Sequence, residues 1–189
     1  MNVIKTELEG LLILEPVVFK DNRGYFFEMY AARDFEKIVP GVHFVQDNES
    51  GSAKGVLRGL HFQKGRYSQA KLVRVPVGKV LDVAVDLRPS SPTFGRYHAE
   101  ILSGDNKRMF FIPKGFAHGY LVMEDHTVFQ YKCDEFYEPS SSGSLLWCDP
   151  SIGIDWKMPA GEIILSDKDR NAPLLCEIKK ELENDPFSL

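Results

Sequence analysis

Residues 79–88 have the sequence KVLDVAVDLR and carry the clearest strand signal in the chain. Every second residue from Leu81 to Leu87 is a branched apolar residue, whereas the alternate positions include Asp82 and Asp86. Successive side chains of a strand point to opposite faces, so this period of two predicts a strand with one apolar and one acidic face. Two settings fit it: an antiparallel sheet with a core face and a wet face, or a barrel whose acidic face lines a cavity.

Short runs rich in Val, Ile, Phe and Tyr continue on both sides of this strand, and turn-forming residues separate them at short intervals. Further strands are predicted at residues 71–77, 109–112 and 128–133, and short helices at 31–38 and within 172–182. Many short strands with closely spaced turns are typical of an all-β sandwich or barrel.

The composition is that of an ordinary globular protein, with 43% hydrophobic and 26% charged residues. A chain of this length can bury a full core, and neither a repeat nor a linker divides it, so residues 1–189 are predicted to form one domain. The formal net charge of -4 argues against nucleic acid or a membrane surface as a general partner.

The three cysteines, Cys133, Cys148 and Cys176, form no CxxC pair. Their odd number and wide spacing argue against a disulfide framework or a cysteine zinc site, and favour a reducing compartment. The first ten residues lack a basic segment followed by an apolar run, and no stretch of about 18 apolar residues occurs. A cytoplasmic location is therefore expected.

Residues 55–63, GVLRGLHFQ, place Arg58 and His61 three positions apart among small and apolar residues. In a regular strand this odd spacing puts the two side chains on opposite faces, unless Gly59 introduces a turn or bulge that brings them together. On this segment alone, a core histidine beside a surface arginine is as good an interpretation as a catalytic pair.

Residues 111–119, FIPKGFAHG, have the Pro-x-Gly-x-x-His spacing that resembles the second half of the cupin signature, with His118 at the position of the metal ligand. The first half of that signature supplies His-x-His and then a Glu, but here Gln63 stands in place of the second histidine and no Glu follows. A zinc or iron site needs three or four converging ligands. The pattern therefore predicts the fold without the metal.

Eight separated blocks, in the right order, make the resemblance specific. The chain resembles the dTDP-4-dehydrorhamnose 3,5-epimerase family, the RmlC-like cupins, from about residue 5 to residue 175. The matching blocks are residues 21–24, 44–48, 56–63, 71–74, 82–88, 91–95, 112–119 and 165–169. The resemblance implies an all-β cupin jelly-roll barrel or sandwich with a few short flanking helices.

The resemblance also implies a reaction. Such enzymes invert C3 and C5 of dTDP-4-dehydro-6-deoxy-D-glucose to give dTDP-4-dehydro-L-rhamnose. The C4 ketone acidifies the hydrogens on both neighbouring carbons, so the chemistry needs a base on one face of the sugar, a stabiliser for the enolate oxygen and an acid on the other face. No redox cofactor is expected, since there is no net oxidation, and no metal is expected, since the first cupin motif lacks its ligands.

The family's catalytic residues match three positions. His61 matches the base, and a histidine that titrates near pH 6.5 is available in its neutral form at pH 7. Asp169 matches the residue that orients this histidine, although residues 166–170 alone would indicate a solvated turn. Tyr131 matches the opposing acid. Asp82, on the polar face of its strand, is the alternative partner for His61.

Substrate contacts are implied at a larger set of positions. Arg58 and Lys71 match cations beside the ketone, where a fixed donor stabilises developing negative charge. His118 matches a further polar contact. The residues matching contacts to the dTDP group are Arg23, Glu28, Gln46, Asp47, Asn48 and Lys168, together with Tyr137, which matches an aromatic ring that stacks on the base. The chain departs from the family at Ser142, where some members carry Glu.

Three other functions stay open at this point. The first is a related epimerase that inverts a single carbon or takes another nucleotide 4-ketosugar. The second is a metal-dependent cupin, and the third is a cupin that binds the sugar without turning it over. The resemblance further implies a homodimer in which an N-terminal strand near residues 3–8 pairs with the partner's sheet, which would also protect an exposed edge.

Overall fold

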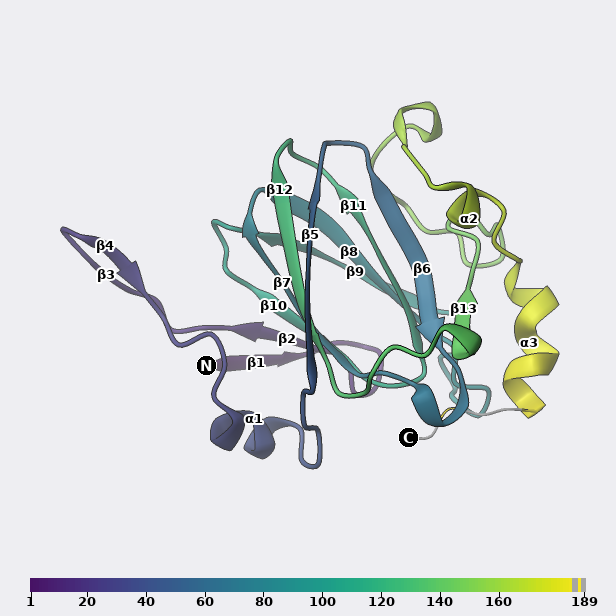
Figure 1. Ribbon diagram of the computed structural model, residues 1–189, viewed down its shortest axis with the longest axis horizontal. Coiled ribbons are helices and arrows are strands. Elements are labelled where there is room, and N and C mark those ends of the chain that lie inside the picture. Colours follow the sequence, from purple (N-terminus) through teal and green to yellow (C-terminus); the bar gives the residue numbers. More distant parts are fainter. Residues whose placement is uncertain (185–186, 188–189) are drawn as a thin grey trace.

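The computed structural model describes residues 1–184 and residue 187. Two antiparallel sheets face each other and enclose an apolar interior, with a few short helices outside them (Figure 1). This arrangement confirms the predicted all-β class. None of the helices in the described ranges is both long and apolar enough to cross a membrane.

The six-stranded sheet has the order β1-β2-β10-β7-β12-β5. Its strands are β1 (Asn2–Lys5), β2 (Leu12–Glu15), β10 (Met109–Ile112), β7 (Lys71–Val77), β12 (Thr127–Cys133) and β5 (Gln46–Ser52). The predicted strands at 71–77, 109–112 and 128–133 are all confirmed, because each pairs with neighbours on both sides. The predicted N-terminal strand is shorter than residues 3–8: it ends at Lys5, and β1 pairs only with β2.

The five-stranded sheet has the order β13-β6-β11-β8-β9. Its strands are β13 (Ser142–Ser144), β6 (Leu57–Gln63), β11 (Phe116–Val122), β8 (Lys79–Asp86) and β9 (Tyr97–Ser103). A separate hairpin, β3 (Phe19–Asp21) and β4 (Gly24–Phe26), extends away from both sheets (Figure 1).

Strand β8 is buried on both of its faces, and neither of the two predicted settings describes it fully. Asp82 and Asp86 are both 0% exposed, so the acidic face is not wet. The outer, apolar face of the sheet is covered by C-terminal segments that include Trp156 and helix α3 (Leu175–Asn184). Helix α3 presents an apolar stripe to this face, which local alternation along β8 could not reveal.

The other helices are short. Helix α1 (Ala32–Ile38) covers the outer face of the six-stranded sheet through Phe35, and helix α2 (Asp167–Arg170) lies next to β6. Single 3-10 turns occur at Gly65–Tyr67, Pro139–Ser141 and Ala160–Glu162. The predicted helices at 31–38 and within 172–182 are therefore confirmed, the second with a later start and end.

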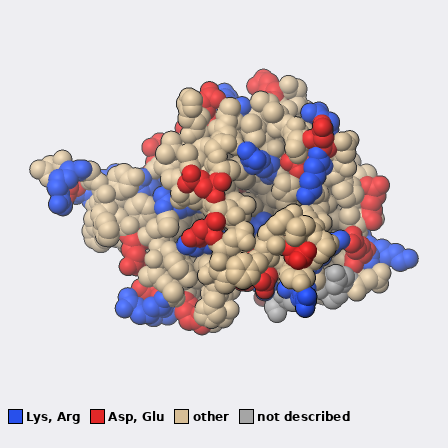
Figure 2. Space-filling view, in the orientation of Figure 1, with Lys and Arg blue, Asp and Glu red and all other residues tan. Residues whose placement is uncertain are grey.

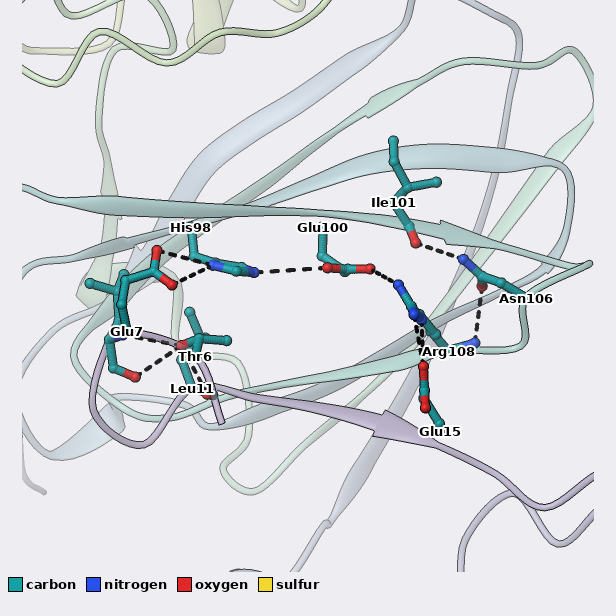
Figure 3. A network of polar contacts seen from close by, with 10 residues as sticks. Thr6, Glu7, Leu11, Glu15, His98, Glu100, Ile101, Asn106 and Arg108 are labelled. Carbon is teal, nitrogen blue, oxygen red and sulfur yellow. Dashed lines mark hydrogen bonds and ion pairs between the residues drawn. The ribbon is translucent and has the colours of Figure 1, made fainter. Parts of the chain in front are cut away.

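The sandwich has two edges at which the sheets meet. We call the side where β9 lies beside β7 and β10 the closed edge, and the side of β5 and β6 the pocket edge. A network of ion pairs joins the sheets at the closed edge (Figure 3). There Arg108 binds Glu100 of β9 at 2.7 Å and Glu15 of β2 at 2.8 Å, and His98 of β9 lies 3.2 Å from Glu7.

Candidate active site

A cavity of about 460 Å³ opens at the pocket edge, between the inner faces of the two sheets. Its volume suits a small polar ligand. The predicted site residues that line it are Arg58, His61, Lys71, His118, Tyr131, Lys168 and Asp169. The structure therefore brings together residues that are up to 111 positions apart in the sequence, from Arg58 to Asp169 (169 minus 58).

A bulge in β6 places Arg58 and His61 on the same face. Arg58 pairs with Tyr120 and His61 pairs with His118, so the register between β6 and β11 shifts within this short stretch. Gly59, with φ of 135°, lies at the shift, and a Cβ there would come 2.5 Å from the Cα of Gly119. The expectation that Gly59 reunites the two side chains is confirmed.

The base candidate His61 has a buried carboxylate behind it. Its Nε2 lies 2.6 Å from Oδ1 of Asp169, whose side chain is 6% exposed. Asp169 is presented by the short helix α2, which Ser166 caps by accepting a hydrogen bond from the Asp169 amide. The solvated turn that the local sequence indicated is therefore wrong for Asp169.

Burial lowers the pKa of His61, and the interaction with Asp169 opposes this shift without cancelling it. The neutral imidazole is therefore the form present at pH 7. Because Nε2 donates to the carboxylate, the lone pair of a neutral ring is on Nδ1. A ring held in this way can accept a proton and share the resulting charge with Asp169.

Tyr131 approaches the same cavity from the opposite sheet. It lies on β12, its hydroxyl has no hydrogen-bond partner among residues 1–184 and 187, and burial raises the pKa of its phenol to about 12. Lys71, on the neighbouring β7, has its ammonium 5.9 Å from the centre of the Tyr131 ring. Burial lowers the pKa of Lys71. A proton donor and a cation thus face the base from across the cavity.

His118 has its own aspartate, and this corrects the alternative role suggested for Asp82. Both carboxylate oxygens of Asp82 lie 3.0 Å from Nε2 of His118, and neither atom pair involves His61. The two histidines are opposite each other in the β6–β11 ladder. The cavity therefore contains two histidine–aspartate pairs side by side, each with a buried carboxylate.

Tyr120 and Ser50 are among the residues of the cavity that sequence reasoning missed. The Tyr120 hydroxyl lies 2.7 Å from Oγ of Ser50, which joins β11 of one sheet to β5 of the other. The Tyr120 ring also stacks on Phe129 at 3.9 Å between ring centres. Alternation could have found Tyr120, because it stands two residues after His118 on the same strand face.

Strand β5 extends a row of polar groups away from the cavity. Nε2 of Gln46 donates to Asn48 at 3.0 Å, and Oε1 of Gln46 accepts from the backbone amide of Tyr137 at 3.2 Å. Asp47 is separated from this row because strand alternation turns it to the outer face, where it binds Lys132 at 2.8 Å. The exposed ring of Tyr137 lies at the end of the row.

Lys168 lies across the cavity from the polar groups of β5. It comes from helix α2, next to Asp169, and its ammonium lies 3.2 Å from Oγ of Ser142. Ser142 is the position at which the sequence departs from some members of the resembling family. The serine hydroxyl accepts a hydrogen bond from the lysine at this position.

Arg23 and Glu28 do not reach the cavity of their own chain. Arg23 lies at the tip of the β3–β4 hairpin, where it binds Asp21 at 2.6 Å with its side chain 85% exposed. Glu28 lines a separate hollow beside that hairpin, together with Phe26 and Met29. The hairpin extends away from the sandwich (Figure 1).

Charge is distributed differently inside and outside the site. Lys, Arg, Asp and Glu are interspersed over the face shown in Figure 2, so that surface offers no extended patch of one sign. The cavity instead contains the cations Arg58, Lys71 and Lys168 beside the two histidine–aspartate pairs. Within residues 1–184 and 187, no group of three or more His, Cys, Asp or Glu side chains is arranged to hold a metal ion.

Comparison with known proteins shows which family the chain belongs to. A family model described as dTDP-4-dehydrorhamnose 3,5-epimerase matches residues 5–177. The chain is 53% identical over 179 residues to dTDP-4-dehydrorhamnose 3,5-epimerase of Escherichia coli K12, covering 94% of this chain and 96% of the relative.

Solved structures extend the comparison. The RmlC epimerase of Legionella pneumophila, solved in complex with dTDP-4-keto-L-rhamnose, is similar with a TM-score of 0.91 and 48% identity, covering 96% of each chain. ChmJ, a 3'-monoepimerase of Streptomyces bikiniensis solved with dTDP-quinovose, has a TM-score of 0.86 and 32% identity, covering 93% of this chain and 89% of ChmJ. These likenesses confirm the predicted cupin jelly roll. The chain belongs to the dTDP-4-dehydrorhamnose 3,5-epimerase family.

Proposed function

We propose that this protein inverts C3 and C5 of dTDP-4-dehydro-6-deoxy-D-glucose and releases dTDP-4-dehydro-L-rhamnose. The observation that carries the proposal is the pairing of His61, backed by Asp169, with Tyr131 on the opposite wall of one cavity. A neutral imidazole and a protonated phenol are the base and acid that inversion next to a ketone requires.

Each inversion is a two-step proton transfer. Nδ1 of His61 removes the hydrogen from the carbon beside the ketone, and the electrons of that C–H bond move to the C4 oxygen as an enolate. Tyr131 then gives its proton to the same carbon on the opposite face, while the C4 carbonyl re-forms. Solvent returns a proton to the phenolate and takes one from the imidazolium, so the protein ends unchanged. A positioned acid or base contributes roughly 10²–10⁴ in rate.

The enolate oxygen needs fixed positive charge close by. Lys71 and Arg58 line the cavity from opposite sheets, and Arg58 is held by Oγ of Ser52 at 3.2 Å. A preorganised donor aimed at a developing oxyanion stabilises the transition state by about 3–4 kcal/mol. His118, fixed by Asp82, supplies a further polar contact to the sugar.

The row that leads out of the cavity suits the nucleotide. Gln46 and Asn48 offer amide groups, Lys168 offers a cation for the diphosphate, and the exposed ring of Tyr137 offers a stacking surface for the base. Asp47, on the outer face of β5, is the one member of this segment whose side chain points away from the row.

A homodimer is part of the proposal, because it supplies two predicted contacts, Arg23 and Glu28, that lie away from the chain's own cavity. The β3–β4 hairpin extends from the body with Phe19, Tyr25 and Phe26 all more than half exposed. Exposed aromatic residues on a projecting arm are typical of a subunit contact. Arg23 and Glu28 lie on or beside this arm, so a second copy would bring them to the nucleotide.

Mixing two inactive variants tests this arrangement. Arg23→Ala removes the arm's cation and His61→Asn removes the base, so each variant alone should be impaired. A mixed dimer contains one cavity with an intact base and an intact arm from the partner, and activity should therefore reappear on mixing. If mixing restores nothing, although the subunits exchange, the arm does not serve the partner's cavity.

Proton exchange with solvent tests the reaction itself. With dTDP-4-dehydro-6-deoxy-D-glucose in D₂O, the protein should place deuterium at both C3 and C5, and NMR should show both centres inverted. Deuterium label and inversion at one carbon alone would instead indicate a single-carbon epimerase, such as the 3'-monoepimerase ChmJ. The absence of both deuterium label and inversion would reject the proposed function.

We expect this activity in the cytoplasm, because the described cysteines are free thiols.

A further inference from the structure

Two rows of side chains cross the inner face of the five-stranded sheet from the closed edge to the cavity. Each row takes one residue from β9, β8, β11 and β6, in that order. The first row is Glu100, Asp82, Tyr120 and Arg58, and the second is His98, Ala84, His118 and His61. In the first row, Asp82 lies between Glu100, toward the closed edge, and Tyr120 and Arg58, toward the cavity.

Asp82 is completely buried, yet charged or titratable groups face it from three strands. His118 and Tyr120 lie on β11, Glu100 lies opposite on β9, and Lys71 acts on it from β7 of the other sheet. Burial raises the pKa of Asp82, and Glu100 adds to this shift, while His118 and Lys71 oppose it. An ionised carboxylate without such partners would be costly at this depth.

The contact with His118 is geometrically well defined. Both carboxylate oxygens are 3.0 Å from Nε2 of His118, and the imidazole is 7% exposed. A carboxylate accepts only, so Nε2 carries the hydrogen, and in a neutral ring Nδ1 is then an acceptor. In this tautomer, Nδ1 of His118 can accept a hydrogen bond from a sugar hydroxyl group.

The effect on Lys71 comes through charge. Burial lowers the pKa of Lys71, which favours loss of its proton, and the interactions with Cys133 and Asp82 oppose that shift. Asp82 is the only carboxylate among these opposing groups. Tyr131 also lies near the ammonium, but a protonated phenol carries no balancing charge.

We propose that Asp82 is a positioning residue, whose carboxylate fixes the ring of His118 so that the imidazole can act on the keto sugar. The inference rests on the proposed function for its kinetic consequence, but not for its geometry. Asp82 touches no substrate atom in this account and acts through His118.

Asp86 provides a matched control on the same strand. It is also 0% exposed, but it accepts hydrogen bonds from Arg88, Ser91 and Thr93, away from the cavity. Burial pushes the pKa of Asp86 upward, but these hydrogen bonds outweigh it and the net pKa is lowered. The two buried aspartates therefore have opposite linkage to folding.

The signs follow from the two shifts. A lowered pKa means that the fold favours the charged form, so Asp86 stabilises the protein above the ordinary Asp pKa, and Asp86→Asn should lower the melting temperature. The raised pKa of Asp82 means that the fold disfavours its charge at neutral pH. Asp82→Asn, which keeps the shape and removes the charge, should therefore leave the melting temperature equal or higher.

The experiment compares Asp82→Asn with Asp86→Asn in kinetics, melting temperature and histidine NMR. Asp82→Asn should lower kcat by roughly 10- to 100-fold, because a small misplacement of a group beside the substrate can cost up to about 10²-fold in rate. Asp86→Asn should keep the native kcat per folded molecule.

The histidine signals give a readout that does not depend on turnover. In ¹⁵N NMR, His118, assigned with His118→Gln, should carry its hydrogen on Nε2 in the native protein and lose this fixed tautomer in Asp82→Asn. A native His118 with the hydrogen on Nδ1 would overturn the inference even if Asp82→Asn fails to fold. So would Asp82→Asn with native kcat, or with a loss of activity that only follows unfolding.

These outcomes are separate from those of the proposed function. If the native protein exchanges hydrogen at both carbons and Asp82→Asn does so at the same rate, only the inference about Asp82 fails. If the native protein exchanges at neither carbon, the proposed function fails, and the tautomer of His118 still tests the position that Asp82 imposes.

Discussion

The two edges of the sandwich are bridged by different chemistry. At the closed edge, Arg108 binds Glu15 and Glu100 at 2.8 and 2.7 Å, and His98 lies between Glu7 and Glu100, so almost every charge faces an opposite one (Figure 3). At the pocket edge the bridges are hydroxyl contacts, Tyr120 to Ser50 and Arg58 to Ser52, at 2.7 and 3.2 Å.

The difference separates stability from function within one fold. Ion pairs at the closed edge hold the sheets together, and the buried Nε2 of His98, without a hydrogen-bond partner among the described residues, lies 3.9 Å from Glu100. At the pocket edge, the ammonium of Lys71 and the hydroxyl of Tyr131 have no hydrogen-bond partner among the described residues, and burial shifts their pKa values. Groups kept in this unsatisfied state cost stability and are typical of catalytic sites.

Replacing the base should give the largest effect and confine it to the pocket edge. His61→Asn removes the proton acceptor, so kcat should fall by roughly 10²–10⁴, the contribution of a positioned base. Deuterium incorporation from D₂O should be lost at both carbons. The melting temperature should change little, because the side chain is 37% exposed. Retention of native exchange would reject His61 as the base.

Replacing the carboxylate behind the base should give a smaller loss. Asp169→Asn keeps the volume but presents an amide to Nε2 of His61, which removes the preference for the reactive tautomer. We expect kcat to fall by roughly 10²-fold, the lower end of the range for a positioned base, with KM nearly unchanged. Steady-state kinetics measure this split, and a rise in KM alone would mean that Asp169 shapes binding and not the base.

The closed edge should respond in stability and not in turnover. Arg108→Met leaves the carboxylates of Glu15 and Glu100 without their shared partner. Because Arg108 is 37% exposed, solvent screens the pairs and the loss should be about 1–2 kcal/mol. For a chain of this size that lowers the melting temperature by about 2–4 °C per kcal/mol. A native melting temperature combined with a fall in kcat would reverse the assignment of the two edges.

The contributions of the two edges to stability should depend on pH with opposite sign. This is the smallest of the expected effects. The interaction with Glu100 raises the pKa of His98 against the effect of burial, so its stabilisation is complete below the ordinary His pKa and is lost as pH rises through the raised value. Burial lowers the pKa of His61, so its contribution is present above the ordinary His pKa and is lost on acidification.

Unfolding curves between pH 5 and 9 can separate the two histidines. His98→Gln should reduce the loss of stability on the alkaline side, whereas His61→Gln should reduce the loss on the acid side. If both substitutions flatten the same side of the profile, the opposite linkage of the two edges is wrong.

The sequence predicted local features well where one segment determines them. Strand β7 has the predicted bounds of 71–77 because its alternation is set within the strand itself. The burial of both faces of β8 escaped prediction, because helix α3, some 90 residues later in the chain, covers the outer face. The alternation of residues along a strand predicts which of its faces is apolar, but it does not predict which segment packs against that face.

The candidate site also combines features that have a local sequence signal with features that have none. The bulge that unites Arg58 and His61 had a local cause, Gly59, and could be anticipated. The pairing of His61 with Asp169 joins residues 108 positions apart and had no local signal, so only the family resemblance suggested it. The same distance in sequence explains why Asp82 was considered for His61, when the register of β8 with β11 places it against His118.

Stereochemistry in Tyr131→Phe tests most directly that the base and acid act from opposite walls of the cavity. This variant keeps His61 but lacks a proton donor on the far face, so in D₂O the enolate should take deuterium back from the side of His61. We predict label at C3 or C5 of recovered substrate without inversion, while product formation falls sharply. Inverted product at the native rate would contradict the placement of acid and base on opposing sheets.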